Sequence, residues 1–301
     1  MLLIKPDRLS VNDSMREIQV HGTKGFPFQG YMNEDRDTEG EGWHWHSETE
    51  IIFVLEGKIR CGVNGAQFEL KEGEGIFINS GSLHMAGLHA GIYKGRSVSF
   101  VFSPEFISGD SKGLLYRKYV EPVTENPDFK GCLLKKEIPW QREILDSLER
   151  IYTYCREEKW EGEILVRNEL SRAWALLAEK EKPENGIYIE KPGNTKQEKR
   201  VKQILKYMKS RYAESITIED MAREVNISGT ECFRCFQKIT GQSPMEYLTF
   251  YRLSQAAHKL RNTDSSITEI CISSGFNHPS YFGKKFREMY GVSPAQYRKT
   301  I

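Results

Sequence analysis

The chain has 301 residues and a nearly balanced charge, with 43 Lys and Arg against 42 Asp and Glu. At about 100–200 residues per domain, this length predicts two domains, each large enough to bury its own core. No apolar run approaches the roughly 20 residues that a membrane-spanning helix needs, and the first residues lack the features of a secretory signal, so we expect a cytoplasmic protein without membrane contact.

Short strands separated by turns are predicted between residues 41 and 102. The β-rich runs are 50–55, 67–70 and 97–102, and the turn signals lie at 56–57, 64–65, 72–75 and 79–82. The dipeptide Asn64-Gly65 is typical of a type I′ hairpin turn, which needs positive φ at both central residues. Many short strands at this spacing predict a β-barrel or a sandwich.

Polar residues at even positions predict a cluster on one face of this sheet. Side chains alternate along an extended strand, so His44, His46 and Glu50 project from the same face, which Ile52 and Val54 continue. In a barrel this face points inward. Trp43 and Trp45 have the opposite parity, and we expect them to pack outside the barrel or against a neighbour. The histidines without comparable partners, expected at the surface or in packing, are His21, His89 and His258.

Two motifs of the cupin family are recognisable in this region. The run His44-Trp-His46-Ser-Glu-Thr-Glu50 followed by Gly57 resembles the first motif, and Gly75 through Gly81 to His84 resembles the second, with Asn79 where proline is usual. The resemblance implies a jelly-roll barrel in which His84 joins His44, His46 and Glu50. Three imidazoles and one carboxylate suit a divalent metal such as zinc, iron, nickel or manganese. Alternatively, the four residues line an effector pocket for a sugar or another small molecule without a metal.

Helical periodicity from about residue 140 to 182 predicts a pair of packed helices. The first apolar stripe is Ile144, Leu145, Leu148, Ile151, Tyr152 and Cys155, and the second is Ile164, Leu165, Leu170, Trp174 and Leu177. The excess of apolar positions makes this pair the expected homodimer interface, with Trp160 or Trp174 as anchors. A charge at Leu148 or Ile151 is then expected to give a monomer.

A polar stretch from 184 to 196 is typical of a linker. We therefore expect an α+β multidomain chain: a barrel at 1–135, a helical dimerisation segment with the linker at 136–195, and an all-α domain at 196–301. From residue 196 onward the chain holds 18 Lys and Arg against 10 Asp and Glu, whereas the first 195 residues hold 25 against 32. A basic module joined to an acidic one favours contact of the basic module with a polyanion.

Helix starts are unusually clear in the last hundred residues. A hydroxyl three residues before a carboxylate is typical of a helix N-terminus, and it occurs at Thr217, Ser228 and Ser266. The sequence that follows these helix N-termini predicts two helix-turn-helix units. The expected core faces of their second helices are Cys232, Cys235 and Phe236 in one and Tyr281, Phe282 and Phe286 in the other. A CxxC sequence inside a helix at such positions indicates packing rather than redox or metal chemistry.

The segment from 199 to 299 resembles the DNA-binding domain of the AraC/XylS family of regulators. The matching residues are 218–222, 236–247, 267–270, 275–277, 281–282 and 286–298. The resemblance implies two recognition helices, joined by a long helix, that enter successive major-groove segments of double-stranded DNA. By position, the resemblance places Thr230, Phe233, Arg234, Ser280, Gly283 and Lys284 against DNA. The helix faces opposite the core add Lys238 and Lys285, which suit phosphates. Phe233 departs from the small or polar residue common there and suits contact with a thymine methyl.

These expectations describe a ligand-responsive, sequence-specific transcription regulator without catalytic residues. An effector in the barrel would change how the barrel, the helical pair and the linker hold the two DNA-binding domains of a homodimer. The resemblance favours an activator, with RNA polymerase as a further partner. Two alternatives stay open: a cupin metalloenzyme of the isomerase or dioxygenase type, which leaves the basic C-terminal part unexplained, and a DNA-binding protein whose ligandless barrel serves only to dimerise.

Overall fold

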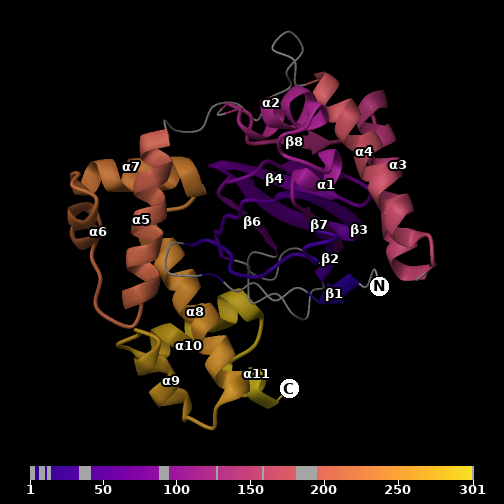
Figure 1. Ribbon diagram of the computed structural model, residues 1–301. Helices are drawn as coiled ribbons and strands as arrows, with labels where there is room; N and C mark the ends of the chain where they lie inside the picture. Colours follow the sequence, from indigo (N-terminus) through magenta and orange to yellow (C-terminus); the bar gives the residue numbers. More distant parts are fainter. Residues whose placement is uncertain are drawn as a thin grey trace.

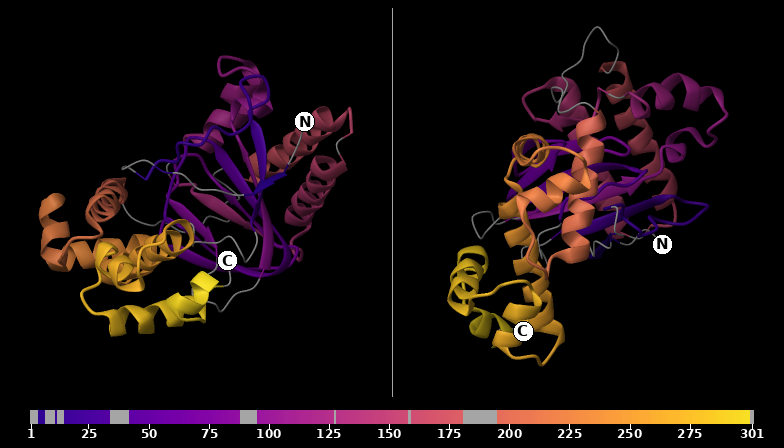
Figure 2. Two further views of the ribbon diagram at one scale, coloured as in Figure 1. Left: turned by 90° about the horizontal axis from the view of Figure 1, so that it is seen from below. Right: turned by 90° about the vertical axis from the view of Figure 1, so that its left-hand side faces the viewer.

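The computed structural model describes residues 4–6, 11, 15–33, 42–87, 95–126, 128–157, 159–180 and 195–299. A β-barrel lies in the middle, a helical hairpin covers one side of it, and the helical C-terminal part lies on the opposite side (Figures 1 and 2). The expected α+β architecture with a cupin-type barrel and an all-α C-terminal domain is confirmed.

The strands are β1 (Ile4–Pro6), β2 (Phe28–Asn33), β3 (Thr49–Val63), β4 (Ala66–Lys71), β5 (Gly75–Ile78), β6 (His84–Gly87), β7 (Gly95–Phe102) and β8 (Gly131–Leu134). The short helices between β7 and β8 are α1 (Glu105–Ser108), the π-helical turn η1 (Tyr116–Val120) and α2 (Glu121–Thr124). The hairpin is α3 (Pro139–Glu157) and α4 (Gly162–Lys180). The C-terminal helices are α5 (Thr195–Arg211), α6 (Ile218–Glu224), α7 (Gly229–Thr240), α8 (Pro244–Asn262), α9 (Ile267–Ser273), α10 (Pro279–Tyr290) and α11 (Pro294–Lys299).

The long strand β3 belongs to both sheets of the barrel. Its first half pairs with β5 and β7, and its second half pairs with β4 and β6. The register shifts between Val54 and Glu56, and Gly57 follows with a φ of 71°. A bulge of this kind bends a strand, so the predicted turn at 56–57 is wrong: the glycine bends a continuous strand instead of ending one. The predicted hairpin turn is confirmed, since Asn64 and Gly65 have φ values of 44° and 98° and β3 pairs with β4 across them.

The two faces of the barrel wall have different partners. Ile52 and Val54 point inward and belong to the apolar cluster of the barrel interior, as the parity of β3 predicts. Ile51 and Phe53 point outward and pack in a second cluster under α3 and α4. Glu50 shares the parity of Ile52, so the strand itself directs this carboxylate into the barrel.

The apolar stripes of α3 and α4 face the barrel. Leu148 and Ile151 are completely buried in the cluster that joins the hairpin to the sheet. Trp174 is 3% exposed, and its Nε1 donates a hydrogen bond of 2.8 Å to the carbonyl of Tyr119. These three residues are therefore unavailable as dimer contacts, contrary to expectation, because the outer wall of the barrel already covers them. Trp160, in contrast, is 96% exposed between α3 and α4.

The C-terminal helices form two units joined by α8. The predicted starts at Thr217 and Ser266 are confirmed as reciprocal capping boxes, and Ser228 caps α7 by accepting from the amide of Glu231. At α7 the reciprocal bond is replaced by an ion pair of 3.0 Å between Glu231 and Arg200 of α5. The predicted linker lies almost wholly outside the described residues. None of the described helices combines the length and the apolarity that crossing a membrane requires.

Candidate functional site

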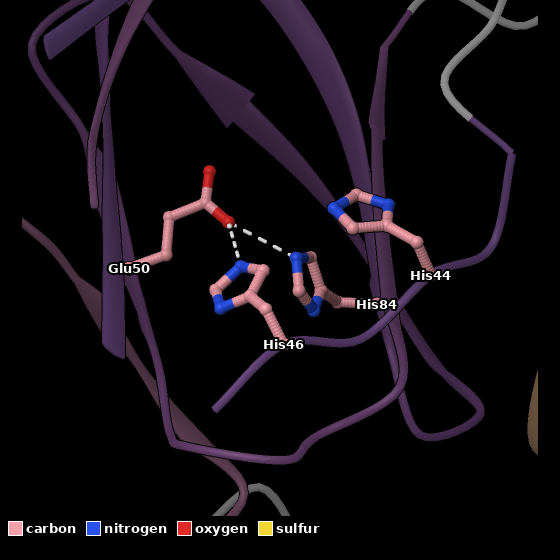
Figure 3. Close-up of side chains that lie close together, drawn as sticks. All are labelled: His44, His46, Glu50 and His84. Atoms are coloured by element: carbon pink, nitrogen blue, oxygen red, sulfur yellow. Dashed lines mark hydrogen bonds and ion pairs between the residues drawn. The ribbon is translucent and has the colours of Figure 1, made fainter. Parts of the chain in front are cut away.

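Four polar side chains converge inside the barrel: His44, His46, Glu50 and His84 (Figure 3). One ligand atom from each lies within 4.8 Å of the others, and every one of the four residues is at most 6% exposed. The backbones of His44 and His84 form an isolated β-bridge, with two N–H to O=C bonds of 2.9 Å. β3 contributes Glu50. The structure thus brings together all four residues that the cupin resemblance selects.

Backbone carbonyls orient all three imidazoles in the same way. In each case Nδ1 donates a hydrogen bond to the carbonyl of a residue two positions away. The acceptors are Gly42 for His44 (3.0 Å), Glu48 for His46 (3.1 Å) and Ser82 for His84 (2.9 Å). A proton on Nδ1 leaves the Nε2 lone pair free, which is how metal-binding histidines are commonly held by their surroundings.

The centre of the cluster contains the carboxylate of Glu50 and the two imidazole nitrogens that face it. Oε2 of Glu50 lies 3.3 Å from Nε2 of His46 and 3.0 Å from Nε2 of His84. Because Nδ1 of each neutral imidazole carries the proton that a backbone carbonyl accepts, the lone pair of Nε2 faces this carboxylate oxygen, and a proton or a cation has to lie between them. A divalent cation bound between these side chains would be a common partner for both nitrogens and the carboxylate. Three nitrogen donors and one oxygen donor therefore fit a divalent transition metal.

Burial and mutual charge shift the pKa values in this cluster. Burial acts to raise the pKa of Glu50, but His46 and His84 outweigh it and hold the pKa well below its usual value. Burial, reinforced by His84 and His46, holds the pKa of His44 well below its usual value. Burial acts to lower the pKa of His84, but Glu50 outweighs it and raises the pKa. The ionised Glu50 and the neutral His44 are therefore in the protonation state that binds a cation, whereas the raised pKa of His84 means that a proton competes with a cation for its Nε2.

A fourth histidine lies against the cluster. His21 is 7% exposed, its Nδ1 is 3.0 Å from the hydroxyl of Tyr31, and its ring centroid is 5.6 Å from that of His46. We expected only a surface or packing role for His21, and no local pattern links it to a histidine 25 positions away. A hollow of about 540 Å³ adjoins this histidine, lined by residues between Arg16 and Pro27 and by Glu48.

Buried polar residues continue from Glu50 along the inner face of the barrel. In the strand register, Ser99 of β7 lies opposite Ile52 on one side and opposite Tyr31 of β2 on the other. Ser99 and Tyr31 therefore share the inward face of Ile52, and Gln29, two residues before Tyr31, shares it as well. All three polar residues are at most 8% exposed. They give the barrel interior groups that can hydrogen bond to a polar molecule.

The predicted DNA-facing residues lie on accessible faces of α7 and α10. Thr230, Phe233, Arg234, Lys238, Ser280 and Lys284 are exposed, and Gly283 and Lys285 are half-buried. Lys285 has a partner within its own helix, since its Nζ is 2.7 Å from a carboxylate oxygen of Glu288.

Tyr281 departs from the expected core face of α10. It is 49% exposed, whereas Phe282 and Phe286 are buried as predicted. Its neighbour Ser280 is also exposed, so Tyr281 adds an aromatic hydroxyl to the accessible face that sequence reasoning missed. The helical period alone assigned it wrongly, because position 281 lies at the edge of the apolar stripe.

The CxxC sequence of α7 lies in the core. Cys232 is completely buried and Cys235 is 2% exposed, which confirms the expected packing role. Burial raises the pKa of Cys232 to about 11 and also raises that of Cys235. Thiols of this kind are mostly protonated and inert at neutral pH.

Comparisons with known proteins agree with both halves of the structure. Residues 221–300 match the model of a helix-turn-helix domain, and residues 33–89 match that of a cupin domain. The uncharacterized HTH-type transcriptional regulator YdeC of Bacillus subtilis (strain 168) is 28% identical over 295 residues, which cover 96% of this chain and 97% of that protein. The melibiose operon regulatory protein of Escherichia coli (strain K12) is 32% identical over 99 residues, 33% of each chain.

Among solved structures, the DNA-binding domain of AdpA in complex with a target DNA is 28% identical. The match covers 34% of this chain and 91% of that chain, with a TM-score of 0.33. The similar proteins are transcriptional regulators, so the metalloenzyme alternative finds no support among them. The chain therefore carries a cupin domain ahead of an AraC-type helix-turn-helix domain, and over almost its whole length it is similar to a transcriptional regulator.

Proposed function

We propose that this regulator binds double-stranded DNA sequence-specifically and responds to a ligand in its cupin barrel, where His44, His46, Glu50 and His84 hold a divalent metal. The observation that carries the metal is the common orientation of the three imidazoles, each with Nδ1 bonded to a carbonyl and Nε2 left for a ligand bond. The approach of Nε2 of His46 and His84 to Oε2 of Glu50, at 3.3 and 3.0 Å, supports it, because a cation between these atoms would offset the repulsion of their facing lone pairs.

For DNA we propose that α7 and α10 are the recognition helices. Phe233 and Arg234 of α7 and Lys284 of α10 have accessible side chains that suit a thymine methyl, a base edge and a phosphate. Tyr281 joins this set because of its exposure. Activation of transcription, contact with RNA polymerase and a cytoplasmic location stay predictions.

The effector is proposed to bind beside the metal. The inward polar groups of Gln29, Tyr31 and Ser99 suit a small hydroxyl-rich molecule such as a sugar, and the hollow beside His21 is a route of approach to this side of the barrel. The name of the melibiose operon regulatory protein fits a carbohydrate effector, although that similarity covers only a third of the chain.

A homodimer is also proposed, through a smaller surface than the sequence predicted. Trp160 and Ile164 are 96% and 62% exposed at the junction of α3 and α4. Large apolar side chains that stay exposed in one chain are typical of contacts with another chain.

The first test measures the metal content of the purified protein by mass spectrometry. We expect about one equivalent in the wild type and a loss of most of it in His84→Ala. His258→Ala is the matched control, because His258 is exposed on α8, away from the cluster. Equal metal content in all three proteins would contradict the site.

The second test measures binding to DNA from upstream of the chain's own gene across a salt series. We expect sequence-selective binding whose affinity falls steeply with salt, with a slope of about −0.9 for each phosphate contacted. Binding that does not distinguish this DNA from random DNA would contradict sequence-specific recognition, whatever the metal assay shows.

A further inference from the structure

The segments that carry the site histidines also contact the DNA-binding domain. Trp43 and Leu83, each adjacent to a site histidine in sequence, and Met85 belong to one apolar cluster with residues of α5 to α8. Trp43 and Leu83 are completely buried, and Met85 is 6% exposed. We call Trp43, Leu83 and Met85 the docking face. Because side chains alternate, the histidines occupy the inner surface of the same short segments whose outer surface is the docking face.

Helix α5 lies over the docking face. Figure 2 (right) shows α5 standing in front of the barrel strands. Its residues Val201, Leu205 and Met208 are completely buried in the same cluster as Trp43. This cluster is shared between the two domains, so the first helix-turn-helix unit does not have a core of its own that is separate from the barrel.

A short chain of hydrogen bonds connects His84 to α5. The amide of Leu83, next to His84, donates to Oδ1 of Asn64 (2.9 Å), and Nδ2 of Asn64 donates to Glu198 of α5 (3.3 Å). Asn64 is completely buried and Glu198 is 8% exposed. Lys130 of the barrel also pairs with Glu198, at 3.6 Å. Buried polar bonds of this kind hold their partners in a defined position, because breaking one leaves unsatisfied groups.

A second polar contact lies one helical turn further along α5. Nζ of Lys202 donates to the carbonyl of Gly81 (3.2 Å) and lies 4.2 Å from the ring centroid of Trp45. Trp45 lies between His44 and His46 in sequence, so α5 contacts both segments that supply site histidines.

The turn of the β3–β4 hairpin contacts the recognition helix itself. A Cβ at Gly65 would overlap the carbonyl oxygen of Lys238 near the end of α7. Nε2 of Gln67 donates to the carbonyl of Thr240, the last residue of α7, at 3.0 Å. The barrel therefore touches α7 at its C-terminal end, while the DNA-facing residues Phe233 and Arg234 stay exposed.

We propose that occupancy of the four-residue site is communicated to DNA through this direct docking of α5 and α7 on the barrel, and not through the linker. The inference rests on the proposed metal site. The ligand atoms are now spread over as much as 4.8 Å. Metal bonds of about 2.0–2.2 Å require them to approach more closely. Movement of His44 or His84 moves Trp43 or Leu83, and a close-packed cluster passes such shifts on instead of absorbing them.

The test compares DNA affinity with and without metal. Chelator-stripped protein is titrated with DNA from upstream of its own gene, alone and with saturating Zn²⁺ or Mn²⁺. We expect the wild-type Kd to change about tenfold, within the usual range for coupled sites. In Glu198→Ala/Lys202→Ala the change is expected to fall below about twofold while metal stoichiometry is kept, since neither residue is a proposed ligand.

Two controls separate direct docking from other routes. Lys206→Ala/Glu214→Ala also removes one positive and one negative charge, but from exposed positions. It should therefore keep the wild-type ratio of the DNA Kd without metal to the DNA Kd with metal. A ten-residue Gly-Ser insertion between positions 187 and 188 should keep it as well. The proposal is overturned if the insertion abolishes the ratio while the docking variant keeps it, or if a metal-loaded wild type binds DNA as the stripped protein does. The latter result leaves the metal site intact, whereas a wild type that takes up no metal overturns both proposals.

Discussion

Replacement of Gly65 by alanine is expected to detach the β3–β4 hairpin from the recognition helix α7. Gly65 has a φ of 98°, where a side chain costs about 1–2 kcal/mol. Its new Cβ would also meet backbone atoms of α7, with the carbonyl carbon of Lys238 at 2.8 Å and Cα of Ile239 at 3.0 Å. Hydrogen-bonded helix backbone does not yield as a flexible side chain does, so the hairpin must move away. Its bond from Gln67 to Thr240, worth about 0.5–1.5 kcal/mol, is then lost.

Gly109→Ala is the matched control for this variant. Gly109 has a φ of 79°, but the nearest atom to its Cβ position is the movable end of Arg167 at 3.5 Å. Both variants incur the backbone cost, and only Gly65→Ala loses the contact with α7. Native-state hydrogen exchange should show protection of α7 amides reduced about 2–12-fold in Gly65→Ala, equivalent to about 0.5–1.5 kcal/mol for the lost bond, and unchanged in Gly109→Ala. Wild-type protection of α7 in Gly65→Ala would refute the docking of the hairpin on this helix.

Three further predictions concern other parts of the chain. Arg234→Ala should weaken binding to the specific DNA by about 1–3 kcal/mol and bind random DNA almost unchanged; an equal loss on both would identify a phosphate contact instead. Trp174→Ala should reduce the free energy of unfolding by about 3–5 kcal/mol in denaturant titrations, whereas Trp160→Ala should change it by less than about 0.5 kcal/mol while lowering the mass in light scattering. Burial lowers the pKa of Lys209 to about 8, so at pH 7 the folded chain holds a charged amine at a cost in free energy that falls as the amine loses its proton. Lys209→Met should therefore be more stable than the wild type at pH 7, by up to about 3 kcal/mol, and this advantage should shrink as the pH rises from 8 to 10; a constant difference would show that Lys209 is not charged and buried.

The residues of the barrel site could be predicted from sequence because strand parity and motif spacing act locally. His44 and His46 lie on a short extended segment, where a shared parity gives them a shared face. Bends at Ser47 and Glu48 separate this segment from β3, so the convergence with Glu50 follows from the motif spacing and not from alternation alone. The capping hydroxyls of Thr217 and Ser266 likewise act within four residues, and the structure has helices beginning where they predict.

Contacts that depend on distant segments could not be predicted. The apolar stripe containing Leu148 and Ile151 does not specify what it packs against, so the same pattern is compatible with contact to the barrel wall or to a second subunit. His21 lies beside His46 only because the chain folds back over the barrel. Trp43 was expected to pack outside the barrel or on a neighbour, and its partner, α5, lies more than 150 positions further along the chain.

The shared cluster around Trp43 also matters for anyone who cuts this chain into fragments. A fragment beginning near residue 196 contains every helix of the DNA-binding domain, but it leaves Val201, Leu205 and Met208 without the barrel residues that cover them. Such a fragment exposes an apolar strip along α5, and exposed strips of this kind promote self-association. Aggregation or altered DNA affinity of the fragment would then reflect the missing cover rather than the intrinsic behaviour of the two helix-turn-helix units.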